Sequence, residues 1–247
     1  MILGIDIGNS NAVLSLIDGK NITATGRIST HEDIGVLLDR YLNIPLKYAV
    51  LSSVVPDANR DVIESVRDRL GIETKVIDYK APLGYRLAVD NPEEVGTDIL
   101  MGLTGAVEKY GKPVVVIDLG TATTIFAVNR EGVFCGGTIH PGVRLEMRAL
   151  TTGTAQLPNA RITPPKKVLA TTTKECMRSG VFYGHAGMID MILDKAEEEL
   201  GYGFPAVATG GLAETVIPHC RHQIALEKDL IMQGLGIIAD RMETGSC

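Results

Sequence analysis

Ile5-Asp-Ile-Gly-Asn-Ser-Asn-Ala-Val-Leu-Ser-Leu, near the start of the chain, is matched in design by Ile117-Asp-Leu-Gly-Thr-Ala-Thr-Thr-Ile-Phe-Ala-Val. In each copy an apolar strand ends in Asp, an aliphatic residue and Gly, and a short polar turn leads into a second apolar strand. The offset from Asp6 to Asp118 is 112 residues, nearly half of the 247-residue chain. The repeat therefore predicts two similar half-domains, residues 1–112 and residues 113–247.

Strand and helix patterns alternate on both sides of this division, which indicates an α/β fold. In the first half we expect strands near residues 1–7, 12–17, 21–28, 48–54 and 74–78, and helices near residues 32–42, 56–70 and 92–110. In the second half we expect further strands near residues 133–139 and 206–209, and helices from residue 141, over residues 173–200 and before residue 242.

Composition excludes several classes of protein. With 45% apolar and 22% charged residues the chain is too hydrophobic to be disordered, and no run approaches the roughly 20 apolar residues that cross a bilayer. A formal charge of −6, 4% aromatic residues and the lack of Trp argue against a nucleic-acid surface. We therefore expect a cytoplasmic protein whose partners are small molecules, with four reduced cysteines, Cys135, Cys176, Cys220 and Cys247.

Both Asp-x-Gly turns have the composition of a phosphate-binding loop, because glycine lets backbone N–H groups approach an anion. Short polar side chains follow both turns: Asn9, Ser10 and Asn11 in the first copy, and Thr121, Thr123 and Thr124 in the second. Asp118 adds a hard oxygen ligand for a cation that accompanies nucleotide phosphates. One such turn alone is more often a plain hairpin, but two copies at matching positions favour phosphate binding.

A pair of glycines, Gly210 and Gly211, follows the apolar run Ala206-Val-Ala and precedes a helical pattern. Backbone without side chains can lie against the flat face of a purine. A strand-to-helix turn without a ligand has the same pattern, and the sequence weighs the two interpretations equally. Tyr183 and His185 lie in an expected helix of small and apolar residues, where packing or a dimer contact is the simpler interpretation.

Seven ordered motifs resemble those of the type III pantothenate kinases, a family in the superfamily of sugar kinases, heat-shock ATPases and actin. The motifs are Asp6-Ile-Gly-Asn-Ser, Ser52-Ser-Val-Val-Pro, Asn91-Pro-Glu-Glu-Val-Gly-Thr-Asp, Asp118-Leu-Gly-Thr-Ala-Thr-Thr, Gly136-Gly-Thr-Ile-His-Pro-Gly, Thr154-Ala-Gln-Leu-Pro and Thr209-Gly-Gly-Leu-Ala. They cover almost the full length. The resemblance implies two ribonuclease H-like half-domains with a nucleotide cleft between them.

The same resemblance implies ATP-dependent phosphorylation of pantothenate to 4′-phosphopantothenate, the first step of coenzyme A biosynthesis. It also implies a homodimer, Mg²⁺ and a monovalent cation, K⁺ or NH₄⁺. The residues that it assigns to ATP are Asp6, Ile7, Gly8, Asn9, Ser10, Asn11, Ala12, Val13 and Thr121, to which we add Gly210 and Gly211. Asp118 corresponds to the potassium ligand and Asp98 to the catalytic base. Gly96, Thr97, Asp98, Ile99 and Thr173 correspond to substrate contacts, Thr173 across the dimer interface.

The chain departs from the family pattern at two positions. The family reads Gly-Ala-Asp-Arg where this chain reads Gly96-Thr97-Asp98-Ile99, so the arginine that helps to hold the acidic substrate is missing. Arg86, Arg144 and Arg148 are candidates to replace it. The family also commonly has Asp where Phe126 stands.

Plainer interpretations of single residues remain open. Without the resemblance, Asp98 is more simply an acidic residue in the first turn of a helix, and Thr173 an ordinary helix cap. Two alternative functions also remain: a related kinase with a different hydroxylated substrate, which Ile99 favours, and a non-catalytic nucleotide-binding relative.

Overall fold

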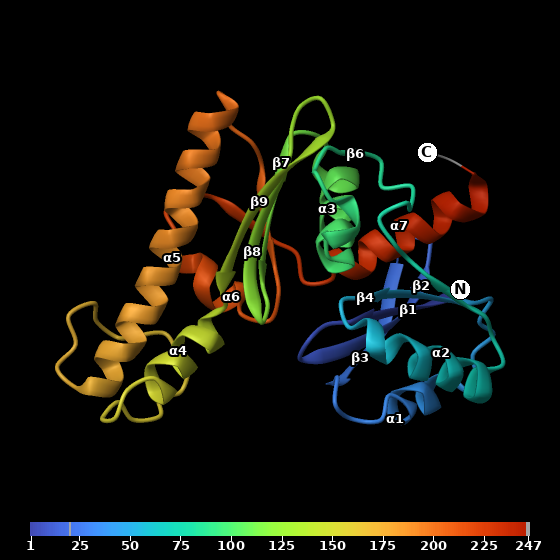
Figure 1. Cartoon of the computed structure of the whole chain (residues 1–247), viewed down its shortest axis with the longest axis horizontal. Helices are drawn as coiled ribbons and strands as arrows, with labels where there is room; N and C mark the ends of the chain where they lie inside the picture. The colour runs from blue at the N-terminus through green and yellow to red at the C-terminus, as the bar shows by residue number, and fades with distance from the viewer. Residues whose placement is uncertain (20, 246–247) are drawn as a thin grey trace. The chain divides into compact units, whose positions relative to one another are not determined.

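The computed structural model describes residues 1–19 and 21–245 (Figure 1). The chain forms two compact units. Unit 1 consists of residues 1–111, 132–135 and the segment from residue 229 onward, and unit 2 consists of residues 112–131 and 136–228. The unit boundaries differ from the predicted division at residue 112 mainly in the last helix, which belongs to unit 1. Cys247 lies outside the described residues, and Cys176 and Cys220 are free thiols.

The sheet of unit 1 has the strand order β3-β2-β1-β4-β5. Its strands are β1 (Ile2–Ile7), β2 (Asn11–Asp18), β3 (Asn21–Ser29), β4 (Ala49–Ser53) and β5 (Thr74–Val76). The first three strands are antiparallel neighbours, whereas β4 pairs in parallel with both β1 and β5. The polar turn between β1 and β2 and the end of β4 therefore lie at the same edge of the sheet.

Helices cover both faces of this sheet. On one face Leu3, Ile5 and Ile7 pack against α1 (Gly35–Leu38), the short 3-10 helix η1 (Asp39–Tyr41) and α2 (Pro56–Leu70). The opposite face carries α7 (Leu230–Thr244), because a Cβ on Gly4 would lie 3.2 Å from the sulfur of Met232. α7 packs in turn against α3 (Thr97–Tyr110).

The contact between α3 and α7 requires two glycines. A Cβ on Gly234 would clash with the backbone of Met101, and a Cβ on Gly105 would lie 2.6 Å from the carbonyl oxygen of Leu230. The two helix backbones therefore approach more closely than side chains would allow. This contact explains why the last helix folds with unit 1.

The second sheet has the order β11-β10-β7-β8-β9-β6, and its first five strands repeat the topology of the unit 1 sheet. These five strands are β7 (Val114–Leu119), β8 (Ala122–Val128), β9 (Val133–Pro141), β10 (Ala206–Thr209) and β11 (Ile224–Leu226). The first three again lie in sequential order, and β10 pairs in parallel with β7 and β11. The first residues of β9 belong to unit 1, where they pair with β6 (Arg86–Leu87). The predicted α/β fold with two similar half-domains is confirmed.

A long helix, α5 (Thr173–Leu200), forms much of the core of unit 2 (Figure 1). Phe182, Ile189 and Leu193 of α5 are fully buried in one cluster with residues of β7, β8 and β10. α4 (Val143–Thr152) packs on α5, and α6 (Ala213–Val216) and the 3-10 helix η3 (Ile217–His219) complete the layer. No helix in the described ranges has the length and apolar character that crossing a membrane requires.

Three predicted helices differ in detail. Only α1 and η1 form where residues 32–42 were expected to be one helix, and there the Tyr41 hydroxyl donates to the carbonyl oxygen of Ala24 at 2.8 Å. The helix expected from residue 92 is a 3-10 turn, η2 (Pro92–Glu94), followed by extended Val95 and then α3. The helix expected from residue 141 begins at Val143.

Candidate functional site

Asp6 and Ser52 lie opposite each other at the carboxyl ends of the parallel strands β1 and β4. The Ser52 hydroxyl is 3.0 Å from Oδ1 of Asp6 and 3.0 Å from Oγ1 of Thr97. The Ser53 N–H donates to Oγ1 of Thr97 at 3.0 Å, and the Thr97 hydroxyl is 3.2 Å from the carbonyl oxygen of Ser53. The first residue of α3 is thus joined to the end of β4.

The next residue of α3, Asp98, folds its carboxylate back over the start of the helix. The N–H of Ile99 donates to Oδ1 of Asp98 at 2.8 Å. A Cβ on Gly96 would lie 2.5 Å from the same oxygen, so a larger residue there would displace the Asp98 carboxylate. The structure therefore brings together Asp6, Gly96, Thr97 and Asp98, all of which the sequence singled out, with Ile99 half-buried next to them.

The two carboxylates have raised pKa values. Burial, with the negative charge of Asp98 as the second cause, raises the pKa of Asp6 from 3.8 to about 7, against the opposing effects of Ser52 and Arg27. Burial also raises the pKa of Asp98, although the N–H of Ile99 acts in the opposite direction. A cation or a proton donor placed between these groups would be electrostatically favoured.

The first glycine turn is an exposed hairpin tip that is fixed at its base. The N–H of Gly8 donates to the carbonyl oxygen of Asn11 at 2.9 Å, and the Thr30 hydroxyl donates to the carbonyl oxygen of Gly8 at 2.7 Å. Asn9, Ser10 and Asn11 are exposed. Below the tip Ile7 and Ala12 are buried, and Val13 pairs with Asp6 across the hairpin.

The second glycine turn is one residue shorter. Leu119 lies opposite Thr123, whereas Ile7 in the first copy lies opposite Ala12. The N–H of Gly120 donates to the carbonyl oxygen of Ala122 at 3.1 Å, and the N–H of Gly142 donates to that of Thr121 at 3.1 Å. The side chain of Thr121 is exposed, as a ligand contact requires.

Gly210 lies against Asp118 at the carboxyl ends of β10 and β7. Thr209 is the register partner of Asp118, and Gly210 follows with φ of +94°. A Cβ on Gly210 would clash with Oδ1 of Asp118 and with the backbone of Leu119. Glycine is therefore required here by geometry, and Gly211 beside it is exposed.

Two further positions that the sequence singled out are Thr173 and Phe126. Thr173 is the exposed first residue of α5, but the cap is Thr172, whose hydroxyl accepts from the N–H of Glu175, so the cap interpretation of Thr173 was wrong. Phe126 is half-buried on β8, and a Cβ on Gly137 would lie 2.6 Å from its ring. The ring of Phe126 therefore rests on the glycine surface of β9.

Sequence reasoning missed a buried polar network in unit 2. Nε2 of His185 is 2.8 Å from the Thr123 hydroxyl, and its Nδ1 is 2.9 Å from Oε1 of Glu146. Thr123, expected to be a donor to phosphate, is fully buried and bonded to His185 instead. Thr123 was predicted to contact phosphate because of its position in the repeat. The local sequence does not indicate which face of β8 packs against a histidine 62 residues later.

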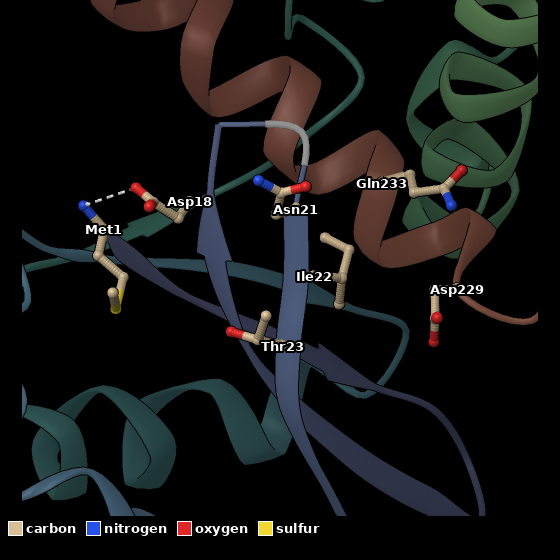
Figure 2. A pocket seen from close by; sticks show the side chains of 7 residues that line it. All are labelled: Met1, Asp18, Asn21, Ile22, Thr23, Asp229 and Gln233. Atoms are coloured by element: carbon tan, nitrogen blue, oxygen red, sulfur yellow. Dashed lines mark ion pairs between the residues drawn. The ribbon is translucent and has the colours of Figure 1, made fainter.

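A cavity of about 530 Å³ in unit 1 lies away from all the predicted site residues (Figure 2). Its lining consists of Met1, Asp18, Asn21, Ile22, Thr23, Asp229 and Gln233. The amino group of Met1 is 3.8 Å from Oδ1 of Asp18 within it. The cavity contains none of the residues that the phosphate-loop interpretation needs.

Comparison with known proteins agrees with the motifs. A sequence model described as type III pantothenate kinase matches residues 2–195. The chain is similar to the type III pantothenate kinase of Bifidobacterium animalis subsp. lactis, with 36% identity over 96% of this chain and 98% of that one. It is 32% identical to the type III pantothenate kinase of Geobacter sulfurreducens, over 98% of this chain and 99% of that one. A solved structure of a conserved Baf family protein from Campylobacter jejuni shares the fold with a TM-score of 0.65 at 18% identity, covering 98% of this chain and 100% of the other.

Proposed function

The chain belongs to the type III pantothenate kinase family, and from that premise we propose that it transfers the γ-phosphoryl group of ATP to the primary hydroxyl of pantothenate. The product is 4′-phosphopantothenate, and the reaction is the first step of coenzyme A biosynthesis. The observation that carries the residue assignment is the group formed by Asp6, Ser52, Thr97 and Asp98 where β1, β4 and α3 meet.

Asp98 is the proposed base. Its carboxylate accepts a hydrogen bond from the substrate hydroxyl and takes the proton as that oxygen forms its bond to the γ-phosphorus and the bond to ADP breaks. The raised pKa of Asp98 makes it a stronger proton acceptor than an exposed aspartate. Phosphoryl transfer demands alignment more than covalent chemistry, and the fixed start of α3 supplies that alignment.

The glycine turns are the proposed ATP-binding elements. Residues 6–13, with Thr121, Gly210 and Gly211, offer amide and hydroxyl side chains and bare glycine backbone to the nucleotide, whereas the N–H groups of Gly8 and Gly120 are bonded within their own turns. Exposure of Asn9, Ser10, Asn11 and Thr121 supports this assignment. The substrate contacts are proposed at Gly96, Thr97, Ile99 and Thr173.

The donor set fits the two cations that the family implies. Mg²⁺ is usually held by one or two carboxylates together with phosphate oxygens and water, and Asp6 supplies such a carboxylate. When bound, Mg²⁺ neutralises charge on the phosphates. Asp118 is the proposed ligand of a monovalent cation, K⁺ or NH₄⁺, which would compensate the charge of a half-buried carboxylate.

A cytoplasmic homodimer is the proposed state of the protein. α5 supports the dimer, because Gly180, Gly184 and Gly187 are exposed and a Cβ added at each would meet nothing within 4 Å in the described chain.

One assay tests the function. Purified protein is incubated with ATP, Mg²⁺ and K⁺, and ADP release is measured against a panel of hydroxylated acids and amides that includes pantothenate. Release with pantothenate and with no better acceptor is the expected result. A clear preference for another acceptor would show that the protein is a kinase for a different hydroxylated substrate, the alternative that Ile99 favours. ATP binding without ADP release for any acceptor would show that it is a non-catalytic nucleotide-binding relative.

A further inference from the structure

The buried network of Thr123, His185 and Glu146 lies directly behind the second glycine turn. Thr123 is 0% exposed and His185 1% exposed. Burying polar side chains is unfavourable unless their hydrogen bonds are made, and here both ring nitrogens have partners. The space beside His185 on α5 is filled by apolar side chains, among them Val181, Phe182 and Ile189.

The partners determine where the hydrogens lie when the imidazole is neutral. A carboxylate only accepts, so Nδ1 of His185 carries the hydrogen that is donated to Glu146. Nε2 is then an acceptor, and the hydrogen in the 2.8 Å contact comes from the Thr123 hydroxyl. The hydrogen bonds from Thr123 to His185 and from His185 to Glu146 therefore hold the Thr123 side chain in one orientation. Because Thr123 has no solvent-accessible surface, it positions other groups rather than reacting itself.

The first turn of helix α4 makes a further contact with the loop Gly120–Ala122. The N–H of Gly142 donates to the carbonyl oxygen of Thr121, and the N–H of Glu146 donates to the carbonyl oxygen of Gly142. Glu146 therefore lies one helical turn after Gly142, whose N–H is bonded to the backbone of Thr121. Glu146 is also linked to Thr123, the residue after Ala122, through the hydrogen bonds of His185. The turn is therefore held by the backbone of Thr121 and by the side chain of Thr123.

We propose that Glu146 and His185 are positioning residues that act through Thr123 to hold the turn Gly120–Ala122 in the conformation that binds the phosphates of a nucleoside triphosphate. The proposal rests on the proposed function for the identity of that ligand. Neither His185 nor Glu146 contacts the ligand in this account. Nδ1 of His140 also lies 3.7 Å from Oε1 of Glu146, which is too far for a hydrogen bond, so among the described residues the imidazole that is bonded to Glu146 is that of His185.

The test measures the affinity for Mg²⁺·ATP by calorimetry, so that it does not depend on which acceptor is phosphorylated. Glu146→Ala removes the far end of the network at a side chain that is 23% exposed, and Glu146→Gln keeps an acceptor for Nδ1. Thr123→Val removes the buried hydroxyl, and Thr123→Ser keeps it. Ser15→Ala is the matched control, because Ser15 is 0% exposed and bonded to Thr25 at 2.9 Å on β2, outside the proposed site.

We expect Glu146→Ala and Thr123→Val each to weaken Mg²⁺·ATP binding by about tenfold or more, with Glu146→Gln, Thr123→Ser and Ser15→Ala within about twofold of the parent protein. The double variant Glu146→Ala/Thr123→Val should bind about as well as the weaker single variant, since both changes break one network. Folded Glu146→Ala protein with parental affinity would overturn the proposal, and so would additive losses in the double variant. If Thr123→Val does not fold, the comparison of Glu146→Ala with Glu146→Gln still decides. Parental protein that binds Mg²⁺·ATP but does not phosphorylate pantothenate would refute the proposed function and leave this test intact.

Discussion

The hydroxyl of Ser52 lies 3.0 Å from Oδ1 of Asp6, and the two residues face each other across the parallel pair β1 and β4. This hydrogen bond stabilises the charged form of Asp6, yet burial and the charge of Asp98 outweigh it and raise the pKa to about 7. The free protein therefore carries an acidic group that titrates near neutrality. Its charge state links the site to the stability of unit 1.

The stability of the ligand-free protein should decrease as the pH rises through this window. Because the pKa of Asp6 is higher in the folded than in the unfolded protein, its contribution is fully present below about pH 4 and is lost as the pH passes about 7. Asp6→Asn cannot titrate. The difference in the free energy of unfolding between variant and parent should shift in favour of the variant by up to roughly 4 kcal/mol from pH 4 to pH 8. Urea unfolding without nucleotide measures it, and a pH-independent difference would contradict the prediction.

Thr97→Ala should destabilise the junction of α3 and β4. It leaves the Ser53 N–H without the acceptor that it has at 3.0 Å, and it removes the neighbour of the Ser52 hydroxyl. The expected cost is about 1–3 kcal/mol in the free energy of unfolding. Thr97→Ser, which keeps the oxygen, serves as the control and should lose much less. Equal losses in both variants would assign the effect to the Thr97 methyl group.

Asp98→Asn tests the proposed base. The amide can still accept from the Ile99 N–H but cannot take a proton, so kcat should fall by at least about a hundredfold while the affinity for ATP is almost unchanged. Steady-state rates and ATP titration separate the two effects. Turnover close to that of the parent would remove Asp98 from the mechanism.

The proposed cation ligand Asp118 predicts a dependence on monovalent ions. Activity should be higher in K⁺ or NH₄⁺ than in Na⁺ alone, and Asp118→Asn should abolish that difference. Asp118 lies against Gly210, so the change to Asn conserves the shape of the contact. Equal rates in Na⁺ and K⁺ with the parent protein would exclude this role for Asp118.

Ile99→Arg tests the missing substrate arginine. If pantothenate is the substrate and no other cation holds its carboxylate, the KM of the parent should be high, and the variant should lower it by about one to two orders of magnitude. If Arg86, Arg144 or Arg148 already holds the acid, Ile99→Arg should change little and loss of that arginine should raise KM. A low parental KM that survives the removal of each of the three would show that this position needs no compensating cation.

Two helices, expected near residues 56–70 and over residues 173–200, form at those residues. Pro56 begins α2, and Gly71, with φ of +67°, follows its last residue Leu70. Gly201 ends α5 in the same left-handed conformation. These limits follow from the restricted φ of proline and the free φ of glycine, which are visible in a single sequence. β6, β11 and α6 have only two to four residues, too few to show a period.

The candidate site could be predicted only where the motif and the site coincide along the chain. Asp6 and Asp118 were proposed from the repeated Asp-x-Gly turn, and Gly96 and Asp98 from the resemblance to a family motif. Ser52 joins Asp6 to Thr97 across strand pairing, and His185 reaches Thr123 across 62 residues. Such contacts depend on which faces of two elements meet, which no local pattern records.

Because α3 packs closely on α7, unit 1 can complete its fold only after the last helix has been translated. Gly105 and Gly234 allow close contact between two helices whose segments are separated in the chain by all of unit 2. Because α3 is translated before α7, the face of α3 that α7 covers gains this cover only after the last helix has been made. The unit that contains Asp6 and Asp98 is thus completed last, although its first strand is translated first. A premature stop codon near the 3′ end of the message would therefore damage the half of the molecule that the ribosome began with.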